Sequence, residues 1–266
     1  MRYMLHLAYV GTRYTGWQRQ ATQYDNVQSV LEKHLSGILG HHTTLNGCGR
    51  TDAGVHAIQY FAHFDTDRTL DFDVVARCNH ILPQDIRIYD IIPVHELAHA
   101  RFDAIERSYI YHIHTHPNPY TQPYSTWYLA DYLNIGIMQE GLAALVKMHD
   151  FRYLCRTPDR VGNTVCSLTE AALYYDAIQS TLLFRFTANR FLKSMIRMMV
   201  ARIIELGTKR ISMDIFLDIN EGRARLPYPT VAYPQGLHLY KIRYPYLDLE
   251  PKNIPFDHIE NCGIKK

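Results

Sequence analysis

Arg50 and Asp52 are the residues best suited to chemistry, because they place a cation and a carboxylate two positions apart in a glycine-rich stretch, residues 47–57. A carboxylate can act as a nucleophile or a base, and glycines let another molecule approach the main chain closely. An ordinary turn has a similar composition, since Asp and Gly are common turn residues. Apolar and β-prone residues on both sides predict that the stretch joins two strands, at about 43–48 and 57–64.

A second candidate is the basic stretch that runs from Arg190 to Leu206, which is predicted to be a helix ending at Gly207. At about 100° per residue, Arg190, Lys193 and Arg197 fall within roughly 60° of one another on a helical wheel. The predicted helix is therefore amphipathic, with a basic stripe opposite an apolar arc. A solvated charged face explains such a stripe as well as a binding surface does.

The first hundred residues predict a lobe that holds the Asp52 loop. Asp25 or Asn26 can cap a helix over 27–39, and Gly40 can end it. Together with the two strands around the loop, the pattern predicts a strand at 3–9, a glycine-containing loop at 11–20, a short helix at 71–78 and a strand at 86–92. This order of strand, helix, strand, strand, helix, strand is that of a ferredoxin-like lobe with an antiparallel sheet.

The second half of the chain roughly repeats that order with insertions. The predicted elements are a strand from 107, helices at 135–148, 190–206 and 212–222, strands at 168–177, 181–187 and 236–244, and an irregular tail after Pro245. We therefore predict an α+β protein of two ferredoxin-like lobes with mainly antiparallel sheets. Residues 1–105 would carry the Asp52 loop and residues 106–266 the basic helix and tail, with the active site in a cleft between the lobes.

The composition limits which classes of protein this chain can belong to. The 266 residues are 47% hydrophobic and 20% charged, which is typical of a globular chain and excludes a disordered one. There is no run of 18 apolar residues and no secretory signal, so we expect a cytoplasmic protein that does not span a membrane. The formal net charge is only +2, so nucleic-acid binding would have to depend on clustered cations. Twenty tyrosines suit surfaces that stack on bases or pack in an interface.

Metal and cofactor sites are not predicted. The five cysteines are widely spaced and contain no Cys-x-x-Cys pair, which argues against a disulfide framework and a zinc site. His112, His114 and His116 alternate and would share one face of a strand, where either metal ligation or packing could explain them. No carboxylate or cysteine is close to them in sequence. A Gly-x-Gly-x-x-Gly or P-loop pattern is also missing, so no nucleotide cofactor is expected.

The order of residues in the Asp52 loop carries a family resemblance. Residues 49–56, Gly-Arg-Thr-Asp-Ala-Gly-Val-His, resemble position for position the active-site loop of the TruA-type tRNA pseudouridine synthases. The resemblance runs from residue 3 to about 244, and the other matching segments are 11–20, 100–102, 107–111, 149–151, 189–197 and 236–239. This chain departs from the family pattern at Val10, at Tyr153 and Leu154, and at Arg190.

The resemblance implies a role for each matching residue. Asp52 would be the catalytic carboxylate and Arg197 its partner across the cleft, where a guanidinium favours the ionised acid. Tyr109 would stack on the target uracil, and it is the nearest candidate for the base that removes the C5 proton. Leu237 would pack against the same uracil, and Arg50 would hold the flipped backbone. Further cations expected to contact the RNA are Arg13, Arg19, Arg190 and Lys193.

The implied reaction converts uridine to pseudouridine at positions 38, 39 and 40 of the tRNA anticodon stem-loop. Because this is an isomerisation, it needs no cofactor and no metal. The resemblance further implies a homodimer in which one tRNA contacts both subunits.

Three alternatives remain from the sequence. A ferredoxin-like sheet with exposed aromatics also suits a noncatalytic RNA-binding protein. A hydrolase would need a second acid near Asp52, and the nearest ones, Asp65 and Asp67, are expected at the far end of a strand. A paralogue of the family could act on another RNA site.

Overall fold

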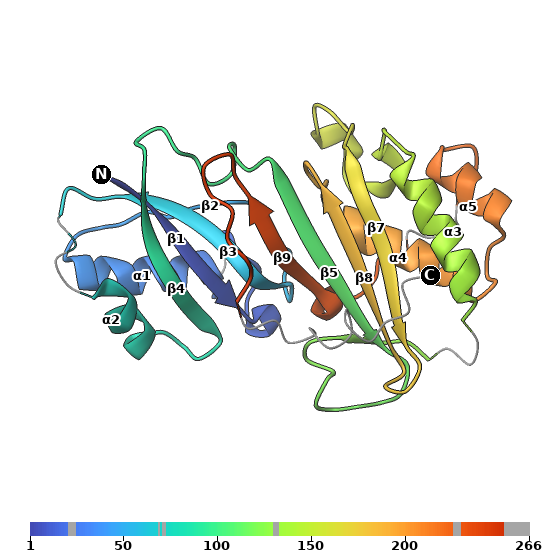
Figure 1. Ribbon diagram of the computed structural model, residues 1–266, viewed down its shortest axis with the longest axis horizontal. Coiled ribbons are helices and arrows are strands. Elements are labelled where there is room, and N and C mark those ends of the chain that lie inside the picture. Colours follow the sequence, from blue (N-terminus) through green and yellow to red (C-terminus); the bar gives the residue numbers. More distant parts are fainter. Residues whose placement is uncertain (21–24, 69, 71–72, 130–132, 226–229, 253–266) are drawn as a thin grey trace. The chain divides into compact units, whose positions relative to one another are not determined.

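The computed structural model describes residues 1–20, 25–68, 70, 73–129, 133–225 and 230–252. The chain forms two compact units, one made of Met1–Ile105 with His238–Ile254 and the other built on Glu106–Leu237. Each unit combines a mainly antiparallel sheet with helices (Figure 1), so the predicted α+β class is confirmed. Within the described ranges, no helix has the length and apolar content needed to cross a membrane.

The first unit has the predicted order of elements. These are β1 (Arg2–Tyr9), α1 (Val27–Leu39), β2 (Asn46–Gly47), β3 (His56–Asp65), α2 (Val74–Ile81) and β4 (Ile86–Val94). The strands lie in the order β4-β1-β3-β2, and every neighbouring pair in this set is antiparallel. The order is that of a split βαβ unit. A later strand, β9 (Leu237–Arg243), pairs in parallel with the start of β3, where His56 lies opposite His238.

Helix α1 forms where its capping residues predicted it. The Asn26 side chain accepts a hydrogen bond from Ser29 N at 2.9 Å, which satisfies an amide that the helix leaves unpaired. Gly40 ends the helix with φ of 76°, a left-handed conformation that favours glycine. The helix buries its apolar face, which consists of Val27, Leu31, Leu35 and Leu39.

The C-terminal part of the first unit covers strand residues from the centre of its sheet. The Gln59 side chain donates to Leu249 O at 2.9 Å and accepts from Ile242 N at 2.9 Å. Tyr244 packs edge-on against Phe61 and donates to Ala100 O at 2.7 Å. His6 is fully buried on β1, where it stacks on Phe61 at 4.7 Å. Burial lowers the pKa of His6 to about 4.

The second unit contains β5 (Glu106–His114), β6 (Thr126–Trp127), α3 (Ile135–Val146), β7 (Leu168–Asp176), β8 (Thr181–Ala188), α4 (Met195–Gly207) and α5 (Met213–Asn220). The antiparallel order is β5-β8-β7, and the short strand β6 pairs in parallel with β5. Helices α3 and α4 pack so closely that a Cβ added to Gly141 would lie 2.7 Å from Leu206 Cδ2. In Figure 1, the connection before β7 and the turn between β7 and β8 lie at opposite ends of this sheet.

The predicted helix over 190–206 was wrong at its start. Helix α4 begins at Met195, so Arg190 and Lys193 precede it and share no helical face with Arg197. The reason is the backbone at Ser194, whose φ of 60° is left-handed and interrupts any helix through it. Leu192 is buried ahead of the helix, and its carbonyl accepts from Met195 N at 3.1 Å.

Two smaller expectations also need correction. The short helix predicted at 71–78 is α2, which runs over Val74–Ile81 and is capped by Asp73; positions 71 and 72 lie outside the described residues. Strand β5 ends at His114, so His116 is not on the strand that holds His112 and His114. His114 Nδ1 is instead hydrogen-bonded with Ser125 Oγ at 2.5 Å. Of the predicted irregular tail, residues 253–266 lie outside the described part of the chain.

Candidate functional site

The Asp52 loop joins β2 to β3, as the sequence predicted. Asp52 is half-buried and Arg50 is exposed. Val55 N donates to Asp52 O at 3.2 Å, which closes a tight turn just before β3. Gly54 has φ of 77° within this turn, a conformation that a residue with a side chain adopts only with strain. The backbone around the carboxylate is thus fixed by local bonds, while Asp52 keeps contact with solvent.

A second loop, residues 11–17, holds the Asp52 loop from the β1 side. Gly54 N donates to Tyr14 O at 3.3 Å, and Trp17 N donates to Thr51 O at 3.4 Å. The approach is so close at Gly16, where φ is 101°, that a Cβ there would lie 2.3 Å from Thr51 O. Only glycine fits that position, so Gly16 sets the distance between the two loops.

An aromatic cluster lies beneath both loops. The rings of Trp17 and Tyr60 stack with centroids 4.0 Å apart, and Tyr9 packs against both. The cluster also bonds to the Asp52 loop: Tyr60 Oη donates to Gly49 O at 2.6 Å, and Tyr9 Oη pairs with Thr51 Oγ1 at 2.8 Å. Burial raises the pKa of Tyr60 well above its ordinary value. Its phenol therefore stays protonated and remains a donor to the loop.

The predicted RNA-contacting cations of the first unit differ in their surroundings. Arg13 is exposed, and its nearest carboxylate oxygen, on Asp85, is 3.7 Å away. Asp85 also accepts from Tyr14 Oη at 2.6 Å, so it anchors the loop. Arg19 is bound to Glu32, a buried residue of α1 whose carboxylate also accepts from Leu45 N at 2.9 Å. Arg19 therefore ties its loop to α1, a role that the sequence did not reveal.

In the second unit, Tyr109 lies on β5 with its ring half-buried. Its ring meets Phe191 edge to face, with centroids 5.2 Å apart. Tyr111 lies on the same face of β5, because side chains alternate along a strand. The Tyr111 hydroxyl is bonded with Thr126 Oγ1 at 2.7 Å and donates to Tyr233 O at 2.7 Å. Burial raises the pKa of Tyr111 well above its ordinary value, and the charge of Arg197 partly opposes this rise.

Arg197 is hydrogen-bonded to the segment of chain that leads into Leu237. Arg197 lies in the first turn of α4, and its Nε donates to Ala232 O at 2.6 Å. Ala232 N donates back to Arg197 O at 3.0 Å. The chain then passes over β5 at Gly236, where a Cβ would lie 2.7 Å from both Tyr111 Cζ and Thr126 Oγ1. Leu237 follows directly and is 7% exposed.

The structure thus brings the predicted residues together in two sets. Asp52, Arg50 and Arg13 lie on two adjoining loops of the first unit. Tyr109, Arg197 and Leu237 lie around β5 in the second unit, and Arg190 and Lys193 lie on the connection from β8 to α4. Sequence reasoning missed the residues that fix these side chains in place. They are Gly16, Tyr60 and Asp85 in the first unit, and Tyr111, Ala232 and Gly236 in the second.

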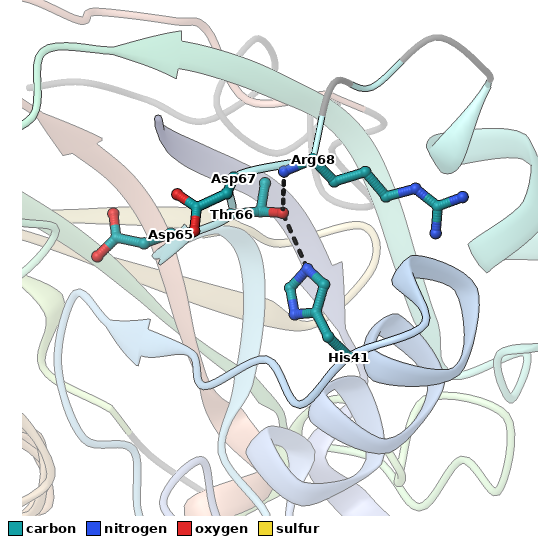
Figure 2. Close-up of a pocket in the computed structure, with 5 residues that line it drawn as sticks. All are labelled: His41, Asp65, Thr66, Asp67 and Arg68. Atoms are coloured by element: carbon teal, nitrogen blue, oxygen red, sulfur yellow. Dashed lines mark hydrogen bonds between the residues drawn. The ribbon is translucent and has the colours of Figure 1, made fainter.

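A surface pocket of about 250 Å³ (Figure 2) includes Asp65. Since Asp65 is the last residue of β3, the pocket lies at the opposite end of that strand from Asp52. It is lined by His41, Asp65, Thr66, Asp67 and Arg68. His41 Nε2 and Arg68 N both hydrogen-bond with Thr66 Oγ1, at 2.9 and 3.1 Å. Asp65 ends β3, whose ten residues span roughly 30 Å. The expectation that Asp65 lies at the far end of the strand is confirmed, and Asp65 forms no carboxylate pair with Asp52.

Comparisons with known proteins agree with the family resemblance of the sequence. A family model described as tRNA pseudouridine synthase matches residues 143–245. The chain is 37% identical to the tRNA pseudouridine synthase A of Azobacteroides pseudotrichonymphae genomovar. CFP2 over 92% of this chain and 97% of that protein. It is 34% identical to the protein of that name from Aquifex aeolicus strain VF5. The latter match covers 90% of this chain and 98% of the Aquifex protein. The tRNA pseudouridine synthase A 2 of Bacillus anthracis is 31% identical over 91% of this chain.

Proposed function

Because this chain belongs to the tRNA pseudouridine synthase family, we propose that it is an isomerase that converts uridine to pseudouridine in tRNA. The observation that carries the proposal is the similarity to curated members along nearly the whole chain. We further propose positions 38, 39 and 40 of the anticodon stem-loop as its targets, as the family resemblance implies.

Asp52 is the proposed catalytic carboxylate. The reaction breaks the bond between uracil N1 and ribose C1′, turns the base, and joins C5 to C1′. An ionised carboxylate can promote the first step by attacking the substrate covalently or by taking a proton from the ribose. The half-buried position of Asp52 and the many bonds that fix its loop support this role. Catalysis needs such fixed positioning, because small displacements of a reacting group slow a reaction strongly.

Arg197 is the proposed ionic partner of Asp52, an assignment that rests on the family motif. A guanidinium beside a carboxylate favours its ionised form, which is the reactive one. Tyr109 and Leu237 are the proposed apolar walls for the target base once it leaves the helical stack, a step that costs a few kcal/mol. The edge-to-face packing of Tyr109 on Phe191 supports a stacking role, because it holds the ring in one orientation.

RNA contacts are proposed for Arg50, Arg13, Arg19, Arg190 and Lys193. Since the whole chain has a formal net charge of only +2, binding would depend on these cations being grouped and would weaken with salt. Arg50 and Arg13 are exposed, in agreement with this role, whereas Arg19 would have to leave Glu32 or contact RNA with its remaining donors. A homodimer and a cytoplasmic location complete the proposal.

The test uses tRNA labelled with tritium at C5 of uridine. Forming the C5 to C1′ bond expels that hydrogen, so tritium appears in water as the product forms. The purified protein, without added nucleotide, should release tritium in proportion to pseudouridine at positions 38–40. Tritium release with pseudouridine mapped to other positions would favour a paralogue with another target. Tight tRNA binding without release would favour a noncatalytic RNA-binding protein.

A further inference from the structure

Two segments of the second unit, residues 150–166 and 189–194, lie next to each other at the start of β7 and the end of β8. Arg156 N donates to Lys193 O at 3.2 Å, which joins them directly. Asn189 continues the link, since its Oδ1 accepts from Ser167 N at 2.8 Å and its N donates to Ser167 O at 3.2 Å. Arg190 is close enough to Cys166 for its charge to affect that thiol.

These segments carry an excess of positive charge. They contain five cations, which are Arg152, Arg156, Arg160, Arg190 and Lys193, and two carboxylates, Asp150 and Asp159. Arg152 is paired with Asp159 at 2.5 Å, and Asp150 accepts from Thr164 Oγ1 at 2.6 Å. In the part of the chain that the structure describes, none of the other four cations has a carboxylate partner within 4.0 Å. The formal charge of these two segments is therefore +3, which is larger than the formal net charge of the whole chain, +2.

Two of these cations lie where the local fold disfavours positive charge. Lys193 and Arg190 stand just ahead of α4, at the helix end that carries a partial positive charge. Cations are unfavourable there, and the first turn of α4 has no acidic residue to offset them. Arg156, Arg160 and Lys193 are exposed, so their charge faces solvent. A bound anion would relieve both the mutual repulsion and the conflict with the helix dipole.

The position of this surface indicates which anion it takes. Phe191 lies between Arg190 and Lys193 in sequence, and it is the residue that packs on Tyr109 at 5.2 Å. Arg107 reaches the same connection, where its Nη1 donates to Asn189 O at 3.3 Å. The cations therefore adjoin the residue proposed to stack on the target base. The negative groups nearest to a base in RNA are the phosphates of its own strand.

We propose that Arg156, Arg160, Arg190 and Lys193 form a cationic surface that binds backbone phosphates of the RNA strand carrying the target uridine. Arg156 and Arg160 are new to the site, and the inference rests on the proposed function. Guanidinium groups suit the task, because they bind phosphate with two parallel hydrogen bonds. The surface would position the strand while Tyr109 holds the base.

The test measures the dissociation constant for unmodified tRNA from about 50 to 300 mM salt, using the full chain and the variants Arg156→Gln, Arg160→Gln and their double. Each lost phosphate contact should reduce the slope of log K against log salt by about 0.7 to 0.9. The double variant should bind about tenfold more weakly at intermediate salt, with a single-turnover rate at saturating tRNA within about twofold of wild type. Arg210→Gln is the matched control, because it removes one exposed charge just beyond the other end of α4.

Several outcomes would overturn the proposal: slopes for Arg156→Gln and Arg160→Gln that equal the slope for Arg210→Gln, a reduced single-turnover rate with unchanged affinity, or no tRNA binding by the wild type. Failure of the proposed function is distinguishable. A wild type that binds tRNA but forms no pseudouridine would refute the isomerase assignment, while weaker binding by the two arginine variants would still support the cationic surface. Melting temperatures equal to wild type would show that the variants are folded.

Discussion

Gly16→Ala should uncouple the Asp52 loop from the loop that holds it. The new Cβ would lie 2.3 Å from Thr51 O, so the two loops must separate by about 1 Å to reach a normal contact. Alanine at φ of 101° adds about 1 to 2 kcal/mol of backbone strain. Together with crowding, typically about 1 to 3 kcal/mol, the free energy of unfolding should fall by about 2 to 5 kcal/mol.

The effect on the reaction should be larger than a loss of folded protein explains. Thr51 immediately precedes Asp52, and a displacement of about 1 Å in a reacting group can slow catalysis about 100-fold. We therefore expect kcat for pseudouridine formation to fall by one to two orders of magnitude, while KM for tRNA changes little. The assay is tritium release at a temperature at which circular dichroism shows the variant fully folded.

Gly37→Ala is the control for this experiment. Gly37 lies inside α1, and a Cβ there would meet nothing within 4 Å. Alanine should stabilise the helix by about 1 kcal/mol and leave kcat unchanged. If folded Gly16→Ala kept the wild-type kcat, the close contact at Gly16 would not be what positions Asp52.

Three further predictions concern two buried histidines, Tyr109 and Arg197. Burial lowers the pKa of His6 and of His63 to about 4, against an ordinary value of 6.5. The unfolded chain therefore binds more protons between these values, and stability should fall as pH drops from 6.5 to 4, by at most about 3 kcal/mol for each histidine. Urea titrations across this range check it, and a His6→Leu variant with the same pH slope would contradict the assignment. Tyr109→Phe should keep most of the activity, whereas Tyr109→Ala should reduce the rate about 10- to 100-fold, because stacking on a base contributes about 1 to 3 kcal/mol. An equal loss of rate in both variants would instead indicate that the phenol acts as a base. Arg197→Ala should lose at least about 100-fold in rate with tRNA affinity nearly unchanged, and a defect mainly in affinity would refute its pairing with Asp52.

The elements that the sequence predicted well are those whose ends carry local signals. Asn26 and Gly40 mark the ends of α1 through contacts within four residues, so the predicted range 27–39 is the observed one. The start of α4 was misplaced because apolar periodicity continues through Phe191 and Leu192, although the left-handed backbone of Ser194 breaks the helix. Nothing in the residue type serine predicts that conformation.

The candidate site likewise contains residues that the sequence indicated and residues that it did not. The family resemblance of their motifs indicated Asp52, Arg50, Tyr109, Arg197 and Leu237, whereas residue type and spacing alone also fitted an ordinary turn around Asp52 and a solvated basic face. Their supports come from residues far away in sequence, such as Gly16 against Thr51 and Glu32 against Arg19, and these pairs carry no local pattern. Arg156 was missed for a related reason, since its link to Lys193 is a backbone hydrogen bond that any residue could make.

Asp52 is the residue proposed to carry out the isomerisation of tRNA uridine, and Asp52→Asn removes its ionisable carboxylate while keeping its size. Unmodified tRNA with uridines at 38, 39 and 40 is incubated with wild type or variant, and pseudouridine is mapped at single-base resolution while tRNA affinity is measured in parallel. We predict product at those positions with the wild type, and none with a variant that binds tRNA nearly as tightly. Normal turnover by Asp52→Asn would show that this carboxylate is not the catalytic group.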